Sequence, residues 1–300
     1  MYIFDQGRFL REPEVSVSVR NKGLNYGLGC FEGIRAFWNS SQNQLYLFRL
    51  FDHYERFRES GKSLHLNIPY TTDQLIQWTI QLVKINAVRE DVYIRPICIK
   101  GEDTLRPDLL SPYNRLFIYL TRLDYIPKPA LHVCVSSWTR IGSNMIPPQT
   151  KPIGGYLNSG LATSEARLNG FDEAILLTKE GKVSEGPGEN IFIIKNKQLC
   201  TPPVSDDILS GITRDTVMQI AQKELNLSVI ERSLARTELY SADEVFFTGT
   251  AIGIKPIIQI DRRIIGTGRE GGITREIRSR YDQIVRGSNQ GYLGYCTPVY

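Results

Sequence analysis

Short apolar runs typical of strands alternate with amphipathic stretches of helical spacing along this chain, without the strand–helix–strand regularity of a doubly wound sheet. Several of the runs are separated only by tight turns, and no internal repeat relates one part of the 300 residues to another. Strands and helices mixed in this way favour an α+β architecture over a parallel α/β one. We therefore predict an α+β fold.

The N-terminal part has two amphipathic segments. A helix is predicted over 50–60, with its apolar side chains on one face at Leu50, Tyr54 and Phe57. Thr71 and Gln74 form the capping-box pattern that begins a second helix. Strands are predicted around these helices, at 2–4, 9–10, 45–48, 92–99 and 116–120.

Two prolines within three residues, Pro127 and Pro129, interrupt any regular element after the first 120 residues. We place the domain boundary there. The predicted division is an N-terminal domain over 1–121, an interdomain loop over 122–130 and a C-terminal domain over 131–300.

The C-terminal part continues with short strands, tight turns and three helices. The helices are predicted at 157–169, where Gly170 ends the helix, at 212–225 and at 274–285. The predicted strands are 131–136, 174–178, 183–185, 191–194, 199–201 and 245–248.

Composition excludes several classes of protein. Lysine and arginine number 36 against 32 acidic residues, and they form no basic run, so we do not expect a nucleic-acid partner. No apolar run approaches the length of a membrane-spanning helix, so we expect no membrane partner either. The five cysteines are widely spaced without a C-x-x-C pair, and the three histidines have no metal-binding spacing, so no disulfide framework or metal site is expected. The first residues lack the pattern of a signal peptide, which predicts a reducing cytoplasm.

Two segments contain residues that could take part in chemistry. Lys151 is flanked by proline and glycine in an otherwise apolar stretch, and burial would lower its pKa and make it a nucleophilic amine. Glu185 begins a glycine- and proline-rich loop that could turn its carboxylate inward. Each has an ordinary alternative, since Lys151 could be a loop lysine and Glu185 could lie in a solvated turn.

Two further segments could bind an anion. Ile212 and Thr213 open an amphipathic helix after a glycine, and the N–H groups at a helix start bind anions. Thr250 follows the end of an apolar strand among small residues. Helix capping is the plainer interpretation of the first segment. Together with an amine and a buried acid, however, these segments supply the parts that hold pyridoxal phosphate.

The chain resembles the class IV aminotransferases, which are pyridoxal-phosphate enzymes of fold type IV, and within them the branched-chain amino acid aminotransferases. The resemblance covers nearly the whole chain. It rests on ordered matches at 26–27, 30–35, 49–56, 92–96, 136–138, 164–167, 184–190, 211–215, 241–245 and 249–251. It implies a smaller α/β N-terminal domain and a larger pseudo-barrel C-terminal domain.

The resemblance also implies a role for individual residues. Lys151 would be the catalytic Schiff-base lysine, Tyr156 would bind the cofactor's phenolic oxygen, and Glu185 would pair with its ring nitrogen. The implied phosphate ligands are Arg56, Ile212, Thr213 and Thr250. The implied substrate-binding residues are Tyr26, Phe31, Tyr93, Arg95, Thr250 and Ala251.

The activity implied is transfer of an amino group between a branched-chain L-amino acid and 2-oxoglutarate, in a homodimer or higher oligomer. The alternatives are a D-amino-acid or (R)-amine aminotransferase of the same fold, a lyase acting on aminodeoxychorismate, and a binding protein without catalysis. Two loops depart from the branched-chain pattern, at 100–108 and 122–130. The first contains Glu102, Asp103 and Arg106, which bear on the choice of amine donor.

Overall fold

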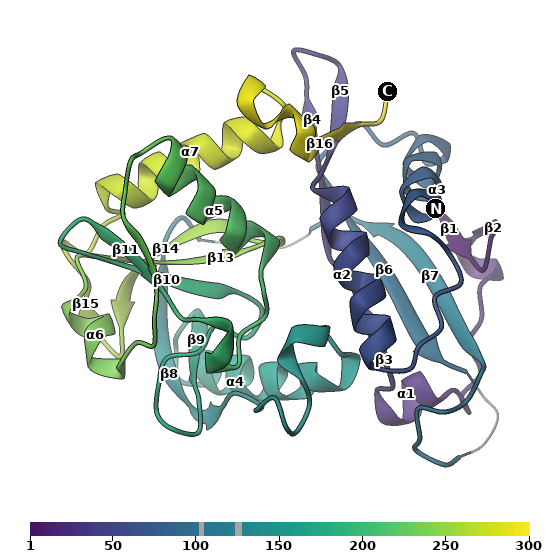
Figure 1. Cartoon of the computed structure of the whole chain (residues 1–300), viewed down its shortest axis with the longest axis horizontal. Helices are drawn as coiled ribbons and strands as arrows, with labels where there is room; N and C mark the ends of the chain where they lie inside the picture. The colour runs from purple at the N-terminus through teal and green to yellow at the C-terminus, as the bar shows by residue number, and fades with distance from the viewer. Residues whose placement is uncertain (102–104, 124–127) are drawn as a thin grey trace. The chain divides into compact units, whose positions relative to one another are not determined.

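The computed structural model forms two compact units (Figure 1). The residues it describes are 1–101, 105–123 and 128–300. The first unit comprises Met1–Tyr125, Thr150–Gly154 and Gln283–Tyr300. The second comprises Ile126–Gln149 and Gly155–Asp282.

This division differs from the predicted one in two places. Residues 150–154 and 283–300 belong to the first unit, although the sequence placed all of 131–300 in one C-terminal domain. The first of these segments is held by backbone hydrogen bonds, including one from Phe31 N to Lys151 O. The second contains a strand that joins the first unit's sheet. The two units are therefore nearly equal in length. Residues 124–127 of the predicted interdomain loop lie outside the described residues.

The first unit is an antiparallel sheet with helices packed against it (Figure 1). Its helices are α1 (Lys22–Tyr26), α2 (Leu50–Ser63) and α3 (Thr72–Ile85). Its strands are β1 (Tyr2–Asp5), β2 (Arg8–Arg11), β3 (Gly29–Phe31), β4 (Ile34–Asn39), β5 (Gln44–Phe48), β6 (Val92–Lys100), β7 (Asn114–Thr121) and β16 (Cys296–Pro298). The strand order is β16-β5-β4-β6-β7-β1-β2, and β3 also pairs with β6.

The predicted helices of this unit are confirmed. Leu50, Tyr54 and Phe57 of α2 are all buried in the core between the helices and the sheet. Thr71 caps α3, where its side chain accepts a hydrogen bond from Gln74 N in a complete capping box. The predicted opening hairpin is also present, as β1 pairs with β2. The short strands β3 and β4 and the helix α1 were not predicted.

The second unit is built around a mixed sheet. Its helices are α4 (Tyr156–Leu168), α5 (Ile212–Lys223), α6 (Arg236–Ser241) and α7 (Gly272–Val285), whose last residues belong to the first unit. Its strands are β8 (Leu131–Thr139), β9 (Glu173–Leu177), β10 (Asn190–Lys195), β11 (Gln198–Thr201), β12 (Val229–Glu231), β13 (Glu244–Gly249), β14 (Gly253–Ile260) and β15 (Arg263–Ile264). The order is β12-β11-β10-β13-β14-β8-β9, with β15 beside β14.

Most predicted elements of the second unit are confirmed, but the strand predicted at 183–185 is wrong. Leu176 exchanges backbone hydrogen bonds with Ser184 and Glu185, and only an isolated bridge joins Leu177 to Val183. Pro187 lacks the N–H that a longer ladder would need. The chain therefore leaves the sheet directly after Glu185, and the loop that follows leads into β10.

All five cysteines are buried and unpaired within the described part of the chain. In the same residues, no helix has both the length and the apolar character needed to cross a membrane.

Candidate active site

Lys151 occupies a strained position in the first unit. Its φ angle is +44°, in the left-handed region that residues other than glycine adopt at a cost. The neighbouring backbone is held against β3, because Phe31 N donates to Lys151 O at 3.3 Å and Cys30 forms an isolated bridge with Pro152. The Nζ atom lies 5.2 Å from the centre of the Phe31 ring. Such strain persists only where the surrounding structure enforces it, and it is concentrated at functional sites.

Three of the predicted substrate-binding residues meet beside Lys151. The Arg95 guanidinium carbon lies 4.2 Å from the centre of the Phe31 ring, and Nη2 donates a hydrogen bond of 3.0 Å to the Tyr93 hydroxyl. A Cβ atom at Gly33 would lie 1.9 Å from that hydroxyl, so the glycine leaves room for it. Within the described residues, the buried Nε of Arg95 has no hydrogen-bond partner. The cluster thus combines an aromatic face with a cationic donor.

Tyr26 contacts a loop instead. It is the last residue of α1, and its hydroxyl donates a hydrogen bond of 2.6 Å to Leu105 O. No hydrogen bond joins Tyr26 to Arg95 in the part of the chain that is described, and the substrate-binding role implied for Tyr26 stays a prediction. Arg106 of the same loop is 83% exposed, with its Nε atom 3.4 Å from Asp108. Glu102 and Asp103 lie outside the described residues.

Arg56 is the predicted phosphate ligand of the first unit, and it is paired with a carboxylate that the sequence did not identify. Glu32 follows β3 and is completely buried. Arg56 donates to Glu32 through Nε at 2.7 Å and through Nη2 at 2.9 Å. The Nδ1 atom of His53 lies 2.8 Å from the same carboxylate. His53 and Arg56 both come from α2, so one helix supplies both partners.

This cluster shifts the titration of two of its members. Burial would raise the pKa of Glu32, but the Arg56 charge and the hydrogen bond from His53 outweigh burial and hold that pKa well below its usual range. Burial lowers the pKa of His53, although the hydrogen bond to Glu32 opposes this effect. At neutral pH we therefore expect an ionised Glu32 and an uncharged His53 that donates Nδ1–H.

Glu185 is the corresponding carboxylate of the second unit, and it is also buried. Its Oε1 atom lies 2.6 Å from Nη2 of Arg140. Its Oε2 atom accepts hydrogen bonds from Asn190 Nδ2 at 2.9 Å and from Leu209 N at 3.1 Å. Three separate segments of the chain therefore orient this carboxylate, which confirms the expectation of an inward-facing acid at this loop.

The start of α5 lies next to this carboxylate. Asn190 Nδ2 also donates to Leu209 O at 2.9 Å, which ties the segment before the helix to β10. A Cβ atom at Gly211, the N-cap residue, would lie 1.9 Å from Asn190 Oδ1, so only glycine permits this close approach. Ile212 and Thr213 follow as buried first residues of the helix. A helix start of this kind favours a bound anion.

The remaining predicted residues of the second unit are Thr250, Ala251 and Tyr156. Thr250 and Ala251 form the turn between β13 and β14. Thr248, just before them, lies opposite Asn190 in the β10–β13 ladder, and its buried hydroxyl has no partner among the described residues. Tyr156 begins α4.

One of the two carboxylates and three of the polar residues that contact them were not identified from the sequence. They are Glu32, His53, Arg140 and Asn190. One signal was available, since His53 and Arg56 are three residues apart and therefore share a helix face. No sequence signal pointed to Arg140, because its partner Glu185 is remote in sequence and only the folded chain brings the two together.

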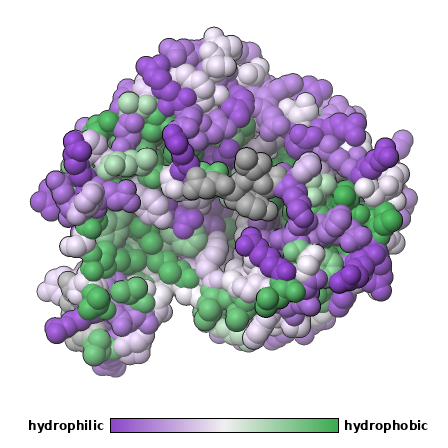
Figure 2. Space-filling view, turned by 180° about the vertical axis from the view of Figure 1, so that it is seen from behind, coloured by the Kyte–Doolittle hydropathy of each residue, from purple (hydrophilic) through white to green (hydrophobic). Residues whose placement is uncertain are grey.

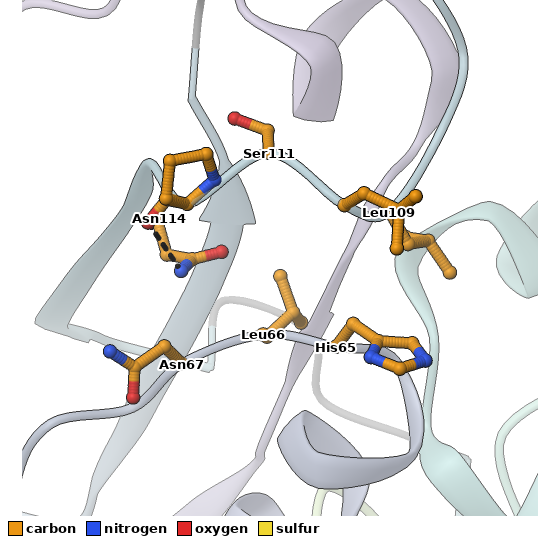
Figure 3. A pocket seen from close by; sticks show the side chains of 8 residues that line it. His65, Leu66, Asn67, Leu109, Ser111 and Asn114 are labelled. Carbon is orange, nitrogen blue, oxygen red and sulfur yellow. Dashed lines mark hydrogen bonds between the residues drawn. The ribbon is translucent and has the colours of Figure 1, made fainter.

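A pocket of about 320 Å³ lies elsewhere in the first unit (Figure 3). It is formed by the segment after α2 and the segment before β7, and none of the predicted site residues lines it. Beside it, the buried Lys100 ammonium donates to His65 O and Ser111 O, which joins the two segments.

Comparison with known proteins assigns the chain to a family. The model of the family described as "Amino-transferase class IV" matches residues 29–260. The chain belongs to the class IV aminotransferases. A probable branched-chain-amino-acid aminotransferase of Aquifex aeolicus is 42% identical over 100% of this chain and 97% of its own length.

Solved structures of class IV aminotransferases agree closely with this one. The branched-chain aminotransferase of Thermoproteus uzoniensis with norvaline has a TM-score of 0.96 at 44% identity, over 100% of this chain and 99% of that one. The branched-chain amino acid aminotransferase of Thermobaculum terrenum in its PLP-form has a TM-score of 0.92 at 38% identity, over 100% and 98%. The predicted two-domain α+β fold of type IV is confirmed.

Proposed function

We propose that this protein is a pyridoxal-phosphate-dependent transaminase that moves an amino group between branched-chain L-amino acids and 2-oxoglutarate. The observation that carries the proposal is Lys151, a lysine held at φ +44° with its amine beside an aromatic and arginine cluster. The relatives of this chain named as branched-chain aminotransferases, at 34–42% identity over nearly full length, support the same activity.

The residues present fit pyridoxal phosphate. The donor set contains a strained lysine for the aldehyde and a buried carboxylate, Glu185, with the acceptor oxygens that a protonated ring nitrogen needs. The buried Thr248 hydroxyl lies opposite Asn190 in the sheet and has no hydrogen-bond partner among the described residues, so a bound polar group could satisfy it. The bound cofactor would supply a carbonyl that takes up the amino group and a ring that accepts electrons from the substrate's Cα. Arg56, Ile212, Thr213 and Thr250 would hold its phosphate, and Tyr156 its phenolic oxygen.

In this proposal the protein's own groups bind substrate and move protons. Lys151 Nζ takes the proton from the substrate carbon and returns it, acting as general base and then as general acid. Phe31 offers an apolar surface to a branched side chain, whereas the Arg95 guanidinium stacked on it is suited to a carboxylate. Tyr26 is proposed to assist Arg95, and Tyr93, Thr250 and Ala251 to bind the substrate's α-carboxylate. One pocket would then accept both substrates in turn.

The test measures amino-group transfer to 2-oxoglutarate from L-leucine, D-alanine and (R)-1-phenylethylamine, with purified protein and added pyridoxal phosphate. We expect L-leucine to be the best donor. Lys151→Ala should lower the rate by at least about 100-fold, because it removes the general base and acid. Lys179→Ala, at an exposed lysine in a turn, is the matched control and should keep the native rate.

Preference for D-alanine or the (R)-amine would replace the branched-chain assignment with the alternative activity on the same fold. Full activity of Lys151→Ala would refute the role of the lysine. If the protein keeps no cofactor absorbance band after incubation with pyridoxal phosphate and removal of the excess, the proposed transaminase activity is refuted.

We also propose a homodimer or higher oligomer in the cytoplasm. Apolar side chains are exposed on α4, where Leu157 is 73% and Leu168 is 88% exposed. Figure 2 shows separately that hydrophobic residues gather in patches on one face of the surface. Exposed apolar patches are typical of interaction surfaces. Light scattering should give a mass of at least twice the 34.1 kDa of the chain.

A further inference from the structure

Glu32 is the most completely enclosed carboxylate near the predicted phosphate ligand of the first unit. Its side chain has no exposed surface, and its oxygens accept from Arg56, His53 and the N–H of Gly33. A buried carboxylate is costly unless its charge and lone pairs are matched. Here they are matched by a bidentate guanidinium, a ring N–H and a backbone N–H, so the carboxylate is fixed in one orientation.

A contribution to stability is a weak explanation for the presence of this buried ion pair. Apolar residues of similar volume usually stabilise a core as well as a buried ion pair does, or better. The same helix already supplies Tyr54 and Phe57 to the apolar core, both with no exposed surface. A buried ion pair among these residues is better explained by what it orients.

The geometry shows what is oriented. Arg56 faces Glu32 side-on through Nε and Nη2, which fixes the plane of the guanidinium and directs its Nη1 edge away from the carboxylate. A guanidinium held in one plane is suited to fork-like binding of phosphate oxygens. His53 lies one turn before Arg56 on α2, and its Nδ1 atom contacts Oε2, the oxygen that also accepts from Arg56 Nη2.

We propose that Glu32 and His53 are positioning residues that hold Arg56 in the orientation in which it binds the phosphate group of the cofactor. The inference rests on the proposed function, and it adds two residues that act through Arg56. Neither residue needs to touch the cofactor.

The test compares binding of pyridoxal phosphate with binding of pyridoxal, which lacks the phosphate. Both are titrated into apoprotein and followed by tryptophan fluorescence, and the phosphorus NMR resonance of the bound cofactor is recorded. In Glu32→Gln we expect the Kd for pyridoxal phosphate to rise about 10- to 100-fold, as is typical when a supporting partner is lost. The Kd for pyridoxal should stay within about twofold, and the phosphorus signal should shift.

Glu55→Gln is the matched control. Glu55 lies on the same helix, but it is 41% exposed and pairs with Arg58, so this variant should bind both compounds as the native protein does. If Glu32→Gln does not fold, His53→Gln carries the same test with a smaller expected effect, because the amide can still donate.

Three results would overturn the inference. Unchanged affinity for pyridoxal phosphate in both variants would show that Glu32 and His53 have no role in phosphate binding. Equal weakening of pyridoxal and pyridoxal phosphate would indicate a general structural role. Failure of the native protein to bind pyridoxal phosphate would remove the proposed function itself, and it is recognised in the native titration before any variant is measured.

Discussion

The buried carboxylates Glu32 and Glu185 are both paired with arginine but are held in different ways. The side-chain partners of Glu32, His53 and Arg56, come from the single helix α2. The partners of Glu185 come from three segments: the end of β8, the start of β10 and the residues before α5. Formation of one helix therefore suffices to orient the partners of Glu32, whereas Glu185 is oriented only when distant parts of the second unit have closed around it.

The roles proposed for the two carboxylates predict two kinds of defect in their variants. A carboxylate that acts through an arginine should affect how tightly the cofactor is bound, and the defect should disappear when the cofactor is in excess. A carboxylate that pairs with the ring should affect the chemical step, and excess cofactor should not repair it.

The largest expected effect is that of Glu185→Gln. In its proposed role Glu185 keeps the cofactor's ring nitrogen protonated. Loss of its charge should therefore lower kcat by about 100- to 1,000-fold, as when a preorganised electrostatic group is removed. The measurement is kcat at saturating pyridoxal phosphate, with Glu32→Gln measured beside it. Recovery of Glu185→Gln by excess cofactor, or lack of recovery by Glu32→Gln, would break the distinction between the two carboxylates.

The next effect concerns the stability of the first unit. Glu32→Leu leaves the Arg56 guanidinium poorly paired in a mostly buried site, and removal of one partner of a buried pair costs about 3–5 kcal/mol. The double variant Glu32→Leu/Arg56→Leu should regain most of this free energy of unfolding. Hydrogen exchange of the α2 amides in the apoprotein measures this change in stability at the helix itself. A double variant as unstable as the single one would show that the charges themselves stabilise the helix.

The third effect is a dependence of stability on pH. Since the pKa of His53 is lowered from 6.5 in the fold, its stabilisation is complete above pH 6.5 and is lost as the pH falls toward the folded pKa. For one proton the slope is at most about 1.4 kcal/mol per pH unit. The groups acting on His53 are Glu32, Arg56 and Lys151. The contribution of Glu32 to stability is also lost as the pH falls, but only below the ordinary glutamate pKa of 4.5.

Thermal unfolding of the apoprotein between pH 8 and pH 5 checks this expectation. In His53→Gln, stability should depend less on pH above pH 5. The loss of stability at lower pH, to which Glu32 contributes, should remain. A native curve that is flat between pH 7 and pH 5 would mean that the fold leaves the pKa of His53 unshifted. Stability that rises as the pH falls would mean that the fold raises this pKa.

The same comparison explains how much the sequence could predict. Helices α2 and α3 were predicted because their apolar spacing and capping pattern are local. For Glu185 the glycines and proline of its loop left a solvated turn open as an alternative, and its role was implied by the family resemblance. The pairing of β16 with β5 joins residues about 250 positions apart, so it could not be inferred from local pattern. Arg140 was missed for the same reason. Glu32 was missed because its role depends on contacts with the side chains of His53 and Arg56. Those contacts form only when α2 packs against the segment that contains Glu32.

The smallest expected effect comes from Arg140→Lys. Lysine keeps a positive charge near Glu185 but loses the planar fork, so one hydrogen bond to the carboxylate weakens. Asn190 and Leu209 N still hold the other oxygen, and we therefore expect kcat to fall only about 2- to 10-fold, the equivalent of one modest hydrogen bond. Arg56→Lys should act differently, because Glu32 would lose both of its guanidinium contacts at once. A larger loss of kcat in Arg140→Lys than in Glu185→Gln would contradict the view that three segments share the orientation of Glu185, since a carboxylate held from several sides tolerates the loss of one contact.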